Sequence, residues 1–406
     1  MNVFSPKNAG VAGNIWKCVI IYITNKRTYA PIFTIYLLLM PDATTQTVGI
    51  VLGIAQLIGF VFEIPSGYLA DTMGHRNALI IGKSFFVLST LMYVVASGTV
   101  FFIFGAIFFA LAGAMLSGTS SVFIKETLIL LGRESEFTSI LGKIKSNGFI
   151  ASILAIVAVA FMSEVNYRYA FTIVFVLDCI GLLMTIMLRP VSQKETRVLN
   201  STLFNLKDNI FIRYMKLGWL RYVFVLESII AIAFAVIAAF RDPLQQKVGF
   251  SLSMIGIFFA LSRVGIFLAL RCNGVLKPYM NFKRLIILQG TTFTVSLLGA
   301  GYFENQWVVA VCLMVGAIGM WGFDALKYNL YLDHIGHSCY KASFLSINNF
   351  VQKIFSSLFS FLVGMIIIHD NYELSFLIYG YVTVVIVMIA MFILKNQIIV
   401  KEKIVA

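Results

Sequence analysis

The stretch Glu63-Ile-Pro-Ser-Gly-Tyr-Leu-Ala-Asp71-Thr-Met-Gly74-His-Arg76 covers the end of an apolar run, residues 47–70, and the polar segment that follows it. A second apolar run begins after this segment, at residues 78–96. Each run is close to the roughly 20 residues that a helix needs to cross a bilayer. Asp71 ends the first run abruptly, and Gly74 provides a residue that favours a turn. The stretch therefore predicts a tight, charged turn between two membrane helices.

The composition extends this interpretation to the whole chain. Of 406 residues, 60% are hydrophobic and 12% are charged, with a mean hydropathy of +0.91. Soluble domains have about 45–50% apolar and about 25% charged residues. The chain is therefore expected to be an integral membrane protein. The formal net charge of +13 comes from basic residues at the ends of the apolar segments, which indicates topology signals and no nucleic-acid partner.

Apolar segments predict twelve spanning helices, so the expected fold class is an all-α membrane protein. They lie near residues 15–39, 47–70, 77–96, 99–124, 143–162 and 168–188, and near 222–240, 250–271, 284–302, 306–332, 341–368 and 374–394. A basic segment, 189–221, divides the two sets and is interpreted as a cytoplasmic linker. This division predicts an N-terminal six-helix half at 1–188 and a C-terminal half at 222–406, which ends in a short cytoplasmic tail.

The distribution of lysine and arginine predicts the orientation. If the N-terminus is inside, 23 of the 31 basic residues fall in inner segments and only Arg168, Arg241 and Lys247 fall in outer ones. The positive-inside rule then predicts that both termini face the cytoplasm. The protein is expected in the inner (plasma) membrane of the cell. The five cysteines are scattered, so neither a disulfide framework nor a metal site is expected, and no cofactor is expected.

Part of the opening stretch resembles the signature Gly-x-Leu-Ala-Asp-x-x-Gly-x-Arg between helices 2 and 3 of the major facilitator superfamily. The matching residues are Gly67, Leu69, Ala70, Asp71, Gly74 and Arg76. The segments 63–67, 117–121 and 341–346 are also similar to motifs of a bacterial branch of this family. The resemblance implies a secondary transporter, not an enzyme, with two pseudo-symmetric halves and a monomeric state. It also implies that Asp71 latches onto the start of helix 11 and that Gly74 permits the turn.

Ionisable residues inside the predicted spans are the main functional candidates. A charge at the bilayer centre costs roughly 2.5–3.5 kcal/mol on insertion scales, so such residues need partners or a wet cavity. The sequence has nine of them: Lys26, Arg27, Glu63, Asp178, Glu227, Arg263, Asp324, Lys327 and Lys353.

Two adjacent cations, Lys26 and Arg27, fall near the middle of the first predicted helix, close to Tyr29. Two cations with polar neighbours predict a centre that attracts an anion, and the resemblance implies that helix 1 lines the central cavity. The alternative is that one cation pairs with an acid such as Glu63 or Asp178 and only fixes packing.

Further candidates for substrate binding lie on the helix predicted over 306–332. Trp321, Asp324, Lys327 and Tyr328 recur three or four residues apart and so share a face. Asp324 and Lys327 can pair along the helix. This face is interpreted either as a recognition surface in the cavity or as a structural pair surrounded by aromatic packing.

A polar stripe on the next predicted helix, 341–368, includes Asn349 and Lys353. It predicts a water-filled face, although such a stripe can also hydrogen-bond neighbouring helices. Glu63 is expected to form a cytoplasmic-side lock with a base such as Arg263, or to carry a coupling proton. Glu227 and Asp178 are further proton-carrier candidates, and Asp71, Gly74, Arg76 and Asp324 complete the expected coupling or gating set.

Together these features predict a secondary transporter that moves a small organic solute by alternating access. The basic candidates favour an anionic or carboxylate-bearing solute, with protons as the coupling ion. The sequence does not distinguish import from export of the solute, or a symporter from an antiporter. The alternatives are multidrug efflux of lipophilic or cationic compounds, a lipid translocase and a membrane sensor that does not transport. No catalytic set and no phosphate-binding glycine loop is recognisable in the sequence.

Overall fold

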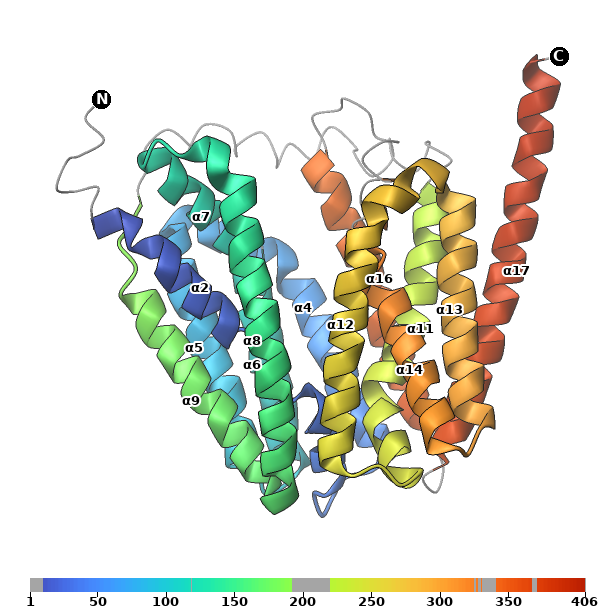
Figure 1. Ribbon diagram of the computed structural model, residues 1–406, viewed down its shortest axis with the longest axis horizontal. Helices are drawn as coiled ribbons and strands as arrows, with labels where there is room; N and C mark the ends of the chain where they lie inside the picture. Colours follow the sequence, from blue (N-terminus) through green and yellow to red (C-terminus); the bar gives the residue numbers. More distant parts are fainter. Residues whose placement is uncertain are drawn as a thin grey trace. The chain divides into compact units, whose positions relative to one another are not determined.

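The computed structural model describes residues 10–191 and 220–405, except 118, 325, 328–329, 331–340 and 367–370 (Figure 1). All regular secondary structure in the described residues is helical. Seven of the described helices are long and apolar enough, by length and composition, to cross a membrane. The predicted all-helical class is therefore confirmed.

The chain forms two compact units. The first unit comprises Met1–Ala30 and Ile58–Gly218, and the second comprises Pro31–Leu57 and Trp219–Ala406. Helix α4 (Thr45–Met73) contributes residues to both units. Residues 192–219, which make up most of the predicted linker, lie outside the described residues, so the predicted boundary of the two halves stays a prediction.

In the first unit, α5 packs against α6 and α9, and α2 packs against α8 and α9. The helices are α2 (Asn14–Thr24), α5 (His75–Val94), α6 (Thr99–Leu116), α7 (Thr119–Leu130), η2 (Glu134–Glu136), α8 (Phe137–Val165) and α9 (Tyr167–Ile186). The span predicted over 99–124 lies within a candidate span over Thr99–Leu130, in which the extended backbone at Ser117 (φ −61°, ψ 120°) separates α6 from α7.

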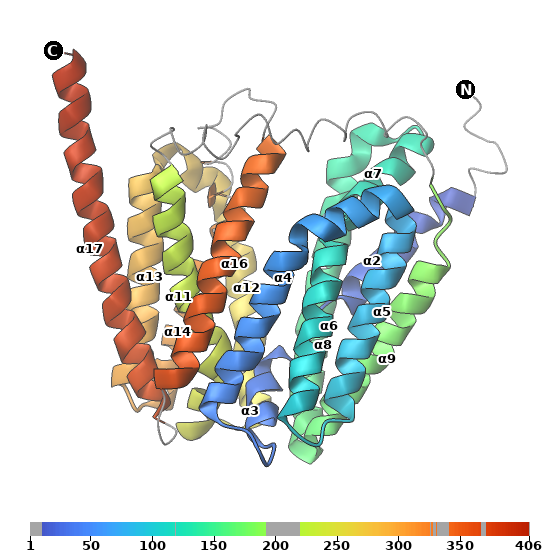
Figure 2. The ribbon, with the colours of Figure 1, turned by 180° about the vertical axis from the view of Figure 1, so that it is seen from behind.

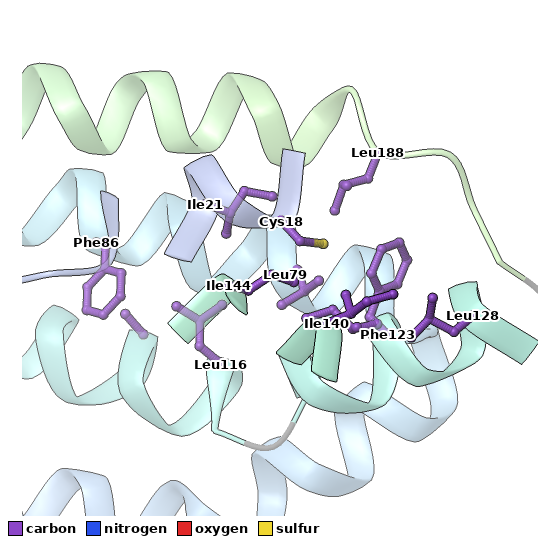
Figure 3. Close-up of a cluster of buried hydrophobic side chains, with 12 residues drawn as sticks. Cys18, Ile21, Leu79, Phe86, Leu116, Phe123, Leu128, Ile140, Ile144 and Leu188 are labelled. Atoms are coloured by element: carbon purple, nitrogen blue, oxygen red, sulfur yellow. The ribbon is translucent and has the colours of Figure 1, made fainter. Parts of the chain in front are cut away.

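The core of the first unit is an apolar cluster between these helices (Figure 3). Its members come from α2, α5, α6, α7 and α8, together with Leu188 just after α9, and the apolar positions of each helix face the cluster. The labelled buried residues include Cys18, Ile21, Phe86, Phe123 and Ile144. This core holds α2 against α7 and α8.

In the second unit, α11 is the central helix, and it contacts α13, α14, α16 and α17. The helices are α3 (Phe33–Leu38), α11 (Leu220–Lys247), α12 (Leu252–Leu276), η4 (Lys277–Tyr279), α13 (Phe282–Tyr302), α14 (Gln306–Trp321), α16 (Lys341–Ile366) and α17 (Tyr372–Val405). Figure 2 shows α16 beside α11. At 34 residues, α17 is longer than the predicted 374–394 span and extends for ~51 Å.

A close glycine contact joins the first part of α4 to α16 within the second unit. A Cβ atom at Gly49 would lie 2.5 Å from the Ser360 carbonyl oxygen and 3.0 Å from the Gly364 Cα. Ser357 Oγ donates a hydrogen bond of 3.1 Å to the Gly53 carbonyl. Small residues allow helix backbones to approach in this way in membranes. A larger residue at Gly49 is therefore incompatible with this packing.

Candidate substrate and coupling site

The first predicted helix is broken where its two cations lie. Helix α2 ends at Thr24, and the next helical turn, η1 (Ala30–Ile32), begins six residues later. The prediction of one helix over 15–39 is therefore wrong, and Lys26 and Arg27 lie in the break. Pro31 contributes to this break, because proline lacks an N–H and disfavours helical backbone at the preceding residue.

The side chain of Arg27 stabilises the end of α2 by binding its backbone carbonyls. Its Nε donates to the Asn25 carbonyl at 3.2 Å, and its Nη2 donates to the Thr24 carbonyl at 3.1 Å. Carbonyl groups in the last turn of a helix lack a helical partner, so these bonds satisfy them. The guanidinium also lies over the ring of Phe86, with Cζ 4.0 Å from the centroid.

The same guanidinium forms a two-point ion pair with Asp178 of α9. Nη1 lies 2.8 Å from Oδ2, and Nη2 lies 2.8 Å from Oδ1. Asp178 is fully buried, and Thr90 Oγ1 of α5 donates to Oδ2 at 3.2 Å. The pairing corresponds to the alternative in which one cation of the break binds an acid.

Lys83 of α5 is a third charged member of this centre that the sequence analysis missed. Its side chain is fully buried, with Nζ 3.4 Å from Asp178 Oδ1, and it donates to Thr24 Oγ1 at 3.0 Å and Asn25 Oδ1 at 2.8 Å. In the count of basic residues, Lys83 is the last residue of the inner segment 71–83, but it also lies within the span predicted over 77–96. Its place in this span is the signal that could have identified it. We call Arg27, Lys83 and Asp178 the first-unit triad.

Lys26 and Tyr29 lie on either side of Arg27 along the chain, and the side chain of Tyr29 is also a partner of Arg27. The Lys26 ammonium lies 4.6 Å from the centroid of the Tyr22 ring, and the side chain is partly buried. Tyr29 is 5% exposed, and its ring packs against Phe171 and Tyr93 with centroid distances of 4.9 Å and 5.7 Å. The structure therefore places Tyr29 in an aromatic cluster.

A second charged centre, the second-unit triad, consists of Glu227 on α11 with Asp324 and Lys327. Lys327 Nζ lies 3.1 Å from Glu227 Oε1 and 3.5 Å from Asp324 Oδ1. The side chains of Glu227 and Lys327 are 0% and 2% exposed, whereas Asp324 is 32% exposed. The structure thus shows the Asp324–Lys327 contact that the spacing suggested and adds Glu227 from another helix.

Of the four remaining candidates for substrate binding, the structure describes the side chains of two. Trp321 is the last residue of α14 and is exposed, and Lys353 is partly buried on α16. Tyr328 lies outside the described residues. Asn349 belongs to α16, but its side chain lies outside the described part. The roles of these four residues stay predictions.

The polar turn between α4 and α5 contains three of the expected coupling or gating residues, Asp71, Gly74 and Arg76. Gly74 adopts φ +87° and ψ 143° at the start of α5, a left-handed conformation that favours glycine. Arg76 Nε donates to the Leu188 carbonyl at 2.7 Å, and its Nη2 donates to the Ile186 carbonyl at 2.6 Å. Arg76 therefore binds the C-terminal end of α9. The side chain of Asp71 lies outside the described part.

Glu63 lies in α4, two residues before Pro65, and its side chain is partly buried. Its carbonyl accepts a hydrogen bond of 3.0 Å from Ser66 Oγ. Ser66 also donates to the Ala114 carbonyl at 3.0 Å, so this part of α4 is fixed against α6. The two expected roles of Glu63, a lock or a proton carrier, stay predictions.

Arg241 follows the helix predicted over 222–240, and the sequence analysis assigned it to an outer segment. It lies within α11, which continues past Pro243 to Lys247, and its side chain is 13% exposed. Arg241 and Asp242 pair, with Nη2 2.6 Å from Oδ1, so both charges can be buried together. Arg263 lies on α12, the next helix.

The two triads carry opposite excess charge within long apolar helices. The first has two cations for one carboxylate, and the second has two carboxylates for one cation. An uncompensated charge in a dry interior is costly, so each centre gains from binding an opposite charge or from a change in protonation. Charged centres inside a bundle of long apolar helices are typical of proteins that move solutes or ions across a membrane.

Comparison with known proteins gives the family. A sequence model for the Major Facilitator Superfamily matches residues 15–360. The chain belongs to this superfamily, and it is a secondary transporter of small solutes and not an enzyme. No curated protein matches the sequence.

Solved structures support the same fold. The nucleoside transporter NupG superposes with a TM-score of 0.76 at 14% identity, over 97% of this chain and 99% of NupG. A point mutant of NupG gives a TM-score of 0.79 at 13% identity, over 93% and 99% of the two chains. A D-xylose-proton symporter gives 0.66 at 15% identity, over 94% and 96%. At these identities the likeness concerns the fold alone, and it confirms the predicted superfamily fold.

Proposed function

We propose that the protein transports a small organic anion that carries a carboxylate, and that it does so by alternating access coupled to protons. The observation that supports this proposal is the composition of the first-unit triad, in which two cations share one carboxylate. All three side chains are at most 12% exposed. A solute carboxylate would neutralise the remaining positive charge.

Within this triad, Lys83 is the cation whose charge is matched least. Asp178 binds Arg27 through two contacts of 2.8 Å, whereas its contact with Lys83 is 3.4 Å long. The other partners of Lys83 are neutral oxygens of Thr24 and Asn25. Charge-assisted pairs are strongest at about 2.7–2.9 Å, so a solute carboxylate can compete for Lys83 more easily than for Arg27.

The broken helix gives this centre polar backbone and side-chain groups. Thr28 in the break is 2% exposed, and its hydroxyl has no hydrogen-bond partner in the described part of the chain. Discontinuous helices form solute sites in several transporter folds, because their free backbone groups lie near the bilayer centre. Lys26, one residue before Arg27, adds a further positive charge to the break.

The second-unit triad supports proton coupling. Its two carboxylates share one lysine, so protonation of one carboxylate would balance the charge. Asp324 is the better candidate, because its side chain is 32% exposed while Glu227 is fully buried. A relative in fold is named as a proton symporter of D-xylose, which agrees with this proposal.

Transport by the purified protein in liposomes tests the proposal. Labelled mono-, di- and tricarboxylates are offered with and without an inward proton gradient. We expect uptake of at least one of them, a loss of about tenfold or more in Lys83→Met, and unchanged uptake in Lys125→Gln, whose side chain is 51% exposed. Asp324→Asn is expected to abolish the acceleration by the gradient but to retain exchange of labelled for unlabelled solute.

Efflux of lipophilic cations is a second candidate function, and the excess carboxylate of the second-unit triad favours it. The same liposomes distinguish the two. Transport of cationic dyes that is lost in Asp324→Asn and retained in Lys83→Met would show that the anion proposal is wrong.

We further propose that both termini face the cytoplasm, as the distribution of basic residues predicts. Cys272, near the end of α12, is exposed and would then lie on the inner side. A variant that retains Cys272 as its single cysteine should resist an impermeant thiol reagent in intact cells and react in inverted vesicles. The reverse result would invert the orientation.

A further inference from the structure

A pair of arginines in the second unit surrounds one aromatic ring. Arg241 extends from α11, and Arg263 and Phe259 belong to α12. The guanidinium carbons of Arg241 and Arg263 lie 4.2 Å and 5.0 Å from the centroid of the Phe259 ring. The two guanidinium groups are therefore neighbours between α11 and α12.

Only one carboxylate balances these two cations in the described part of the chain. Both Nε and Nη2 of Arg241 contact the same oxygen of Asp242, at 2.7 Å and 2.6 Å. Arg263 forms no ion pair with a described acidic residue, and its described contact is the ring of Phe259. Arginine stays protonated in proteins, so it cannot remove the excess charge by losing a proton.

Arg263 does not lie on the most exposed face of α12. Gly256, Ala260 and Ile266 lie seven before, three before and three after Arg263, and all three are buried. The exposed apolar residues Leu261, Val264 and Leu268 occupy another face of the helix. Arg263 is therefore partly buried between the packed and the exposed faces of α12, where a guanidinium without a carboxylate is costly unless an anion compensates it.

We propose that Arg241 and Arg263 form a further carboxylate-binding site within the second unit, in addition to the first-unit triad, with Phe259 holding both guanidinium planes in place. This inference rests on the proposed function, because it takes the solute to be a carboxylate. A guanidinium matches a carboxylate in plane and spacing and can donate two parallel hydrogen bonds. Asp242 keeps Arg241 oriented, which leaves Arg263 as the main donor to the solute.

Thermal melting of the purified full-length protein, with benzoate and citrate as probes, tests this site. Sodium chloride at equal ionic strength controls for screening. We expect a carboxylate to raise the melting temperature of the unmodified protein and its apparent affinity to fall about tenfold or more in Arg263→Gln, equivalent to about 1.4 kcal/mol. Arg263→Lys should keep most of the affinity, and Arg284→Gln, at an exposed residue of α13, should keep all of it.

A melting measurement without ligand separates binding from a structural role. Arg263→Gln removes a charge that has no described acidic partner, so the melting temperature of the empty protein should stay or rise. If this variant does not fold, the double variant Arg241→Gln with Asp242→Asn removes a neutral ion pair and should weaken carboxylate binding by about threefold or more.

The outcomes distinguish a failure of the arginine site from a failure of the anion proposal. Equal stabilisation of the unmodified protein and Arg263→Gln would overturn this site and leave the anion proposal intact. A clear loss of empty-protein stability in Arg263→Gln, with unchanged affinity, would show that Arg263 only supports packing. If no carboxylate stabilises or is transported by the unmodified protein, the anion proposal fails and this site fails with it.

Discussion

The two triads contain the same number of charged groups in opposite arrangements. In the first-unit triad an anion, Asp178, is the shared partner of two cations and is fully buried. In the second-unit triad a cation, Lys327, is the shared partner of two carboxylates, one of them 32% exposed. Removal of the shared residue leaves the other two charges of its triad without that partner, whereas removal of another residue leaves one pair intact. The two triads should therefore tolerate different substitutions.

The largest effect is expected from Asp178→Asn. It leaves Arg27 and Lys83 buried without a carboxylate, and breaking a buried pair from one side typically costs about 3–5 kcal/mol. We expect little folded protein by size-exclusion chromatography in detergent and a strongly lowered melting temperature. Glu227→Gln is the matched control, since it leaves the Lys327–Asp324 contact. Equal losses in the two variants would contradict the proposed difference between the triads.

A double variant sharpens this comparison. Arg27→Gln with Asp178→Asn removes one cation and the carboxylate together, so only Lys83 remains charged. Its melting temperature should exceed that of Asp178→Asn alone, because fewer buried charges lack a partner. A lower melting temperature would mean that the bonds from Arg27 to the broken end of α2 matter more than the charge balance.

The sequence predicted the helical class and the family, and it singled out every charged residue of the two triads except Lys83, because these depend on composition and short spacing. It also suggested the Asp324–Lys327 contact, since residues three apart lie on one helical face. It could not specify that Arg27 binds Asp178, 151 positions away, because that choice depends on tertiary packing. The break after Thr24 was hidden for a related reason: Arg27 stabilises it through bonds that no hydrophobic pattern reveals.

Removal of the lysine from each triad should give opposite pH responses. Lys327→Met removes the lysine that both carboxylates contact and should lose about 2–4 kcal/mol near neutral pH. Protonation removes the charge of these carboxylates, so the melting temperature of this variant should rise as the pH falls from 8 to 5. Lys83→Met leaves the Arg27–Asp178 pair balanced and should melt at nearly the same temperature at both pH values. A pH-independent loss in Lys327→Met would show that its packing matters more than its charge.

A smaller effect is expected from Arg27→Lys, which keeps the charge but loses the planar fork. Lysine cannot hold both oxygens of Asp178 and both carbonyls at the end of α2, so we expect a loss of about 1–3 kcal/mol in thermal melting. Arg241→Lys is a matched control, because Arg241 contacts a single oxygen of Asp242. A larger loss in the control would indicate that the fork of Arg27 contributes little to the broken helix.

The smallest effect on stability is expected at Lys26. Its ammonium lies over the Tyr22 ring at 4.6 Å and belongs to neither triad. A partly exposed contact of this kind is worth about 0.5–1 kcal/mol, so Lys26→Gln should melt within a few degrees of the unmodified protein. Transport should respond more strongly, because Lys26 adds positive charge beside the first-unit triad, and carboxylate uptake should fall several-fold. Tyr22→Leu removes the ring and keeps the charge, so it should preserve uptake. If both variants transport normally, the attraction of the solute rests on the triad and not on the whole break.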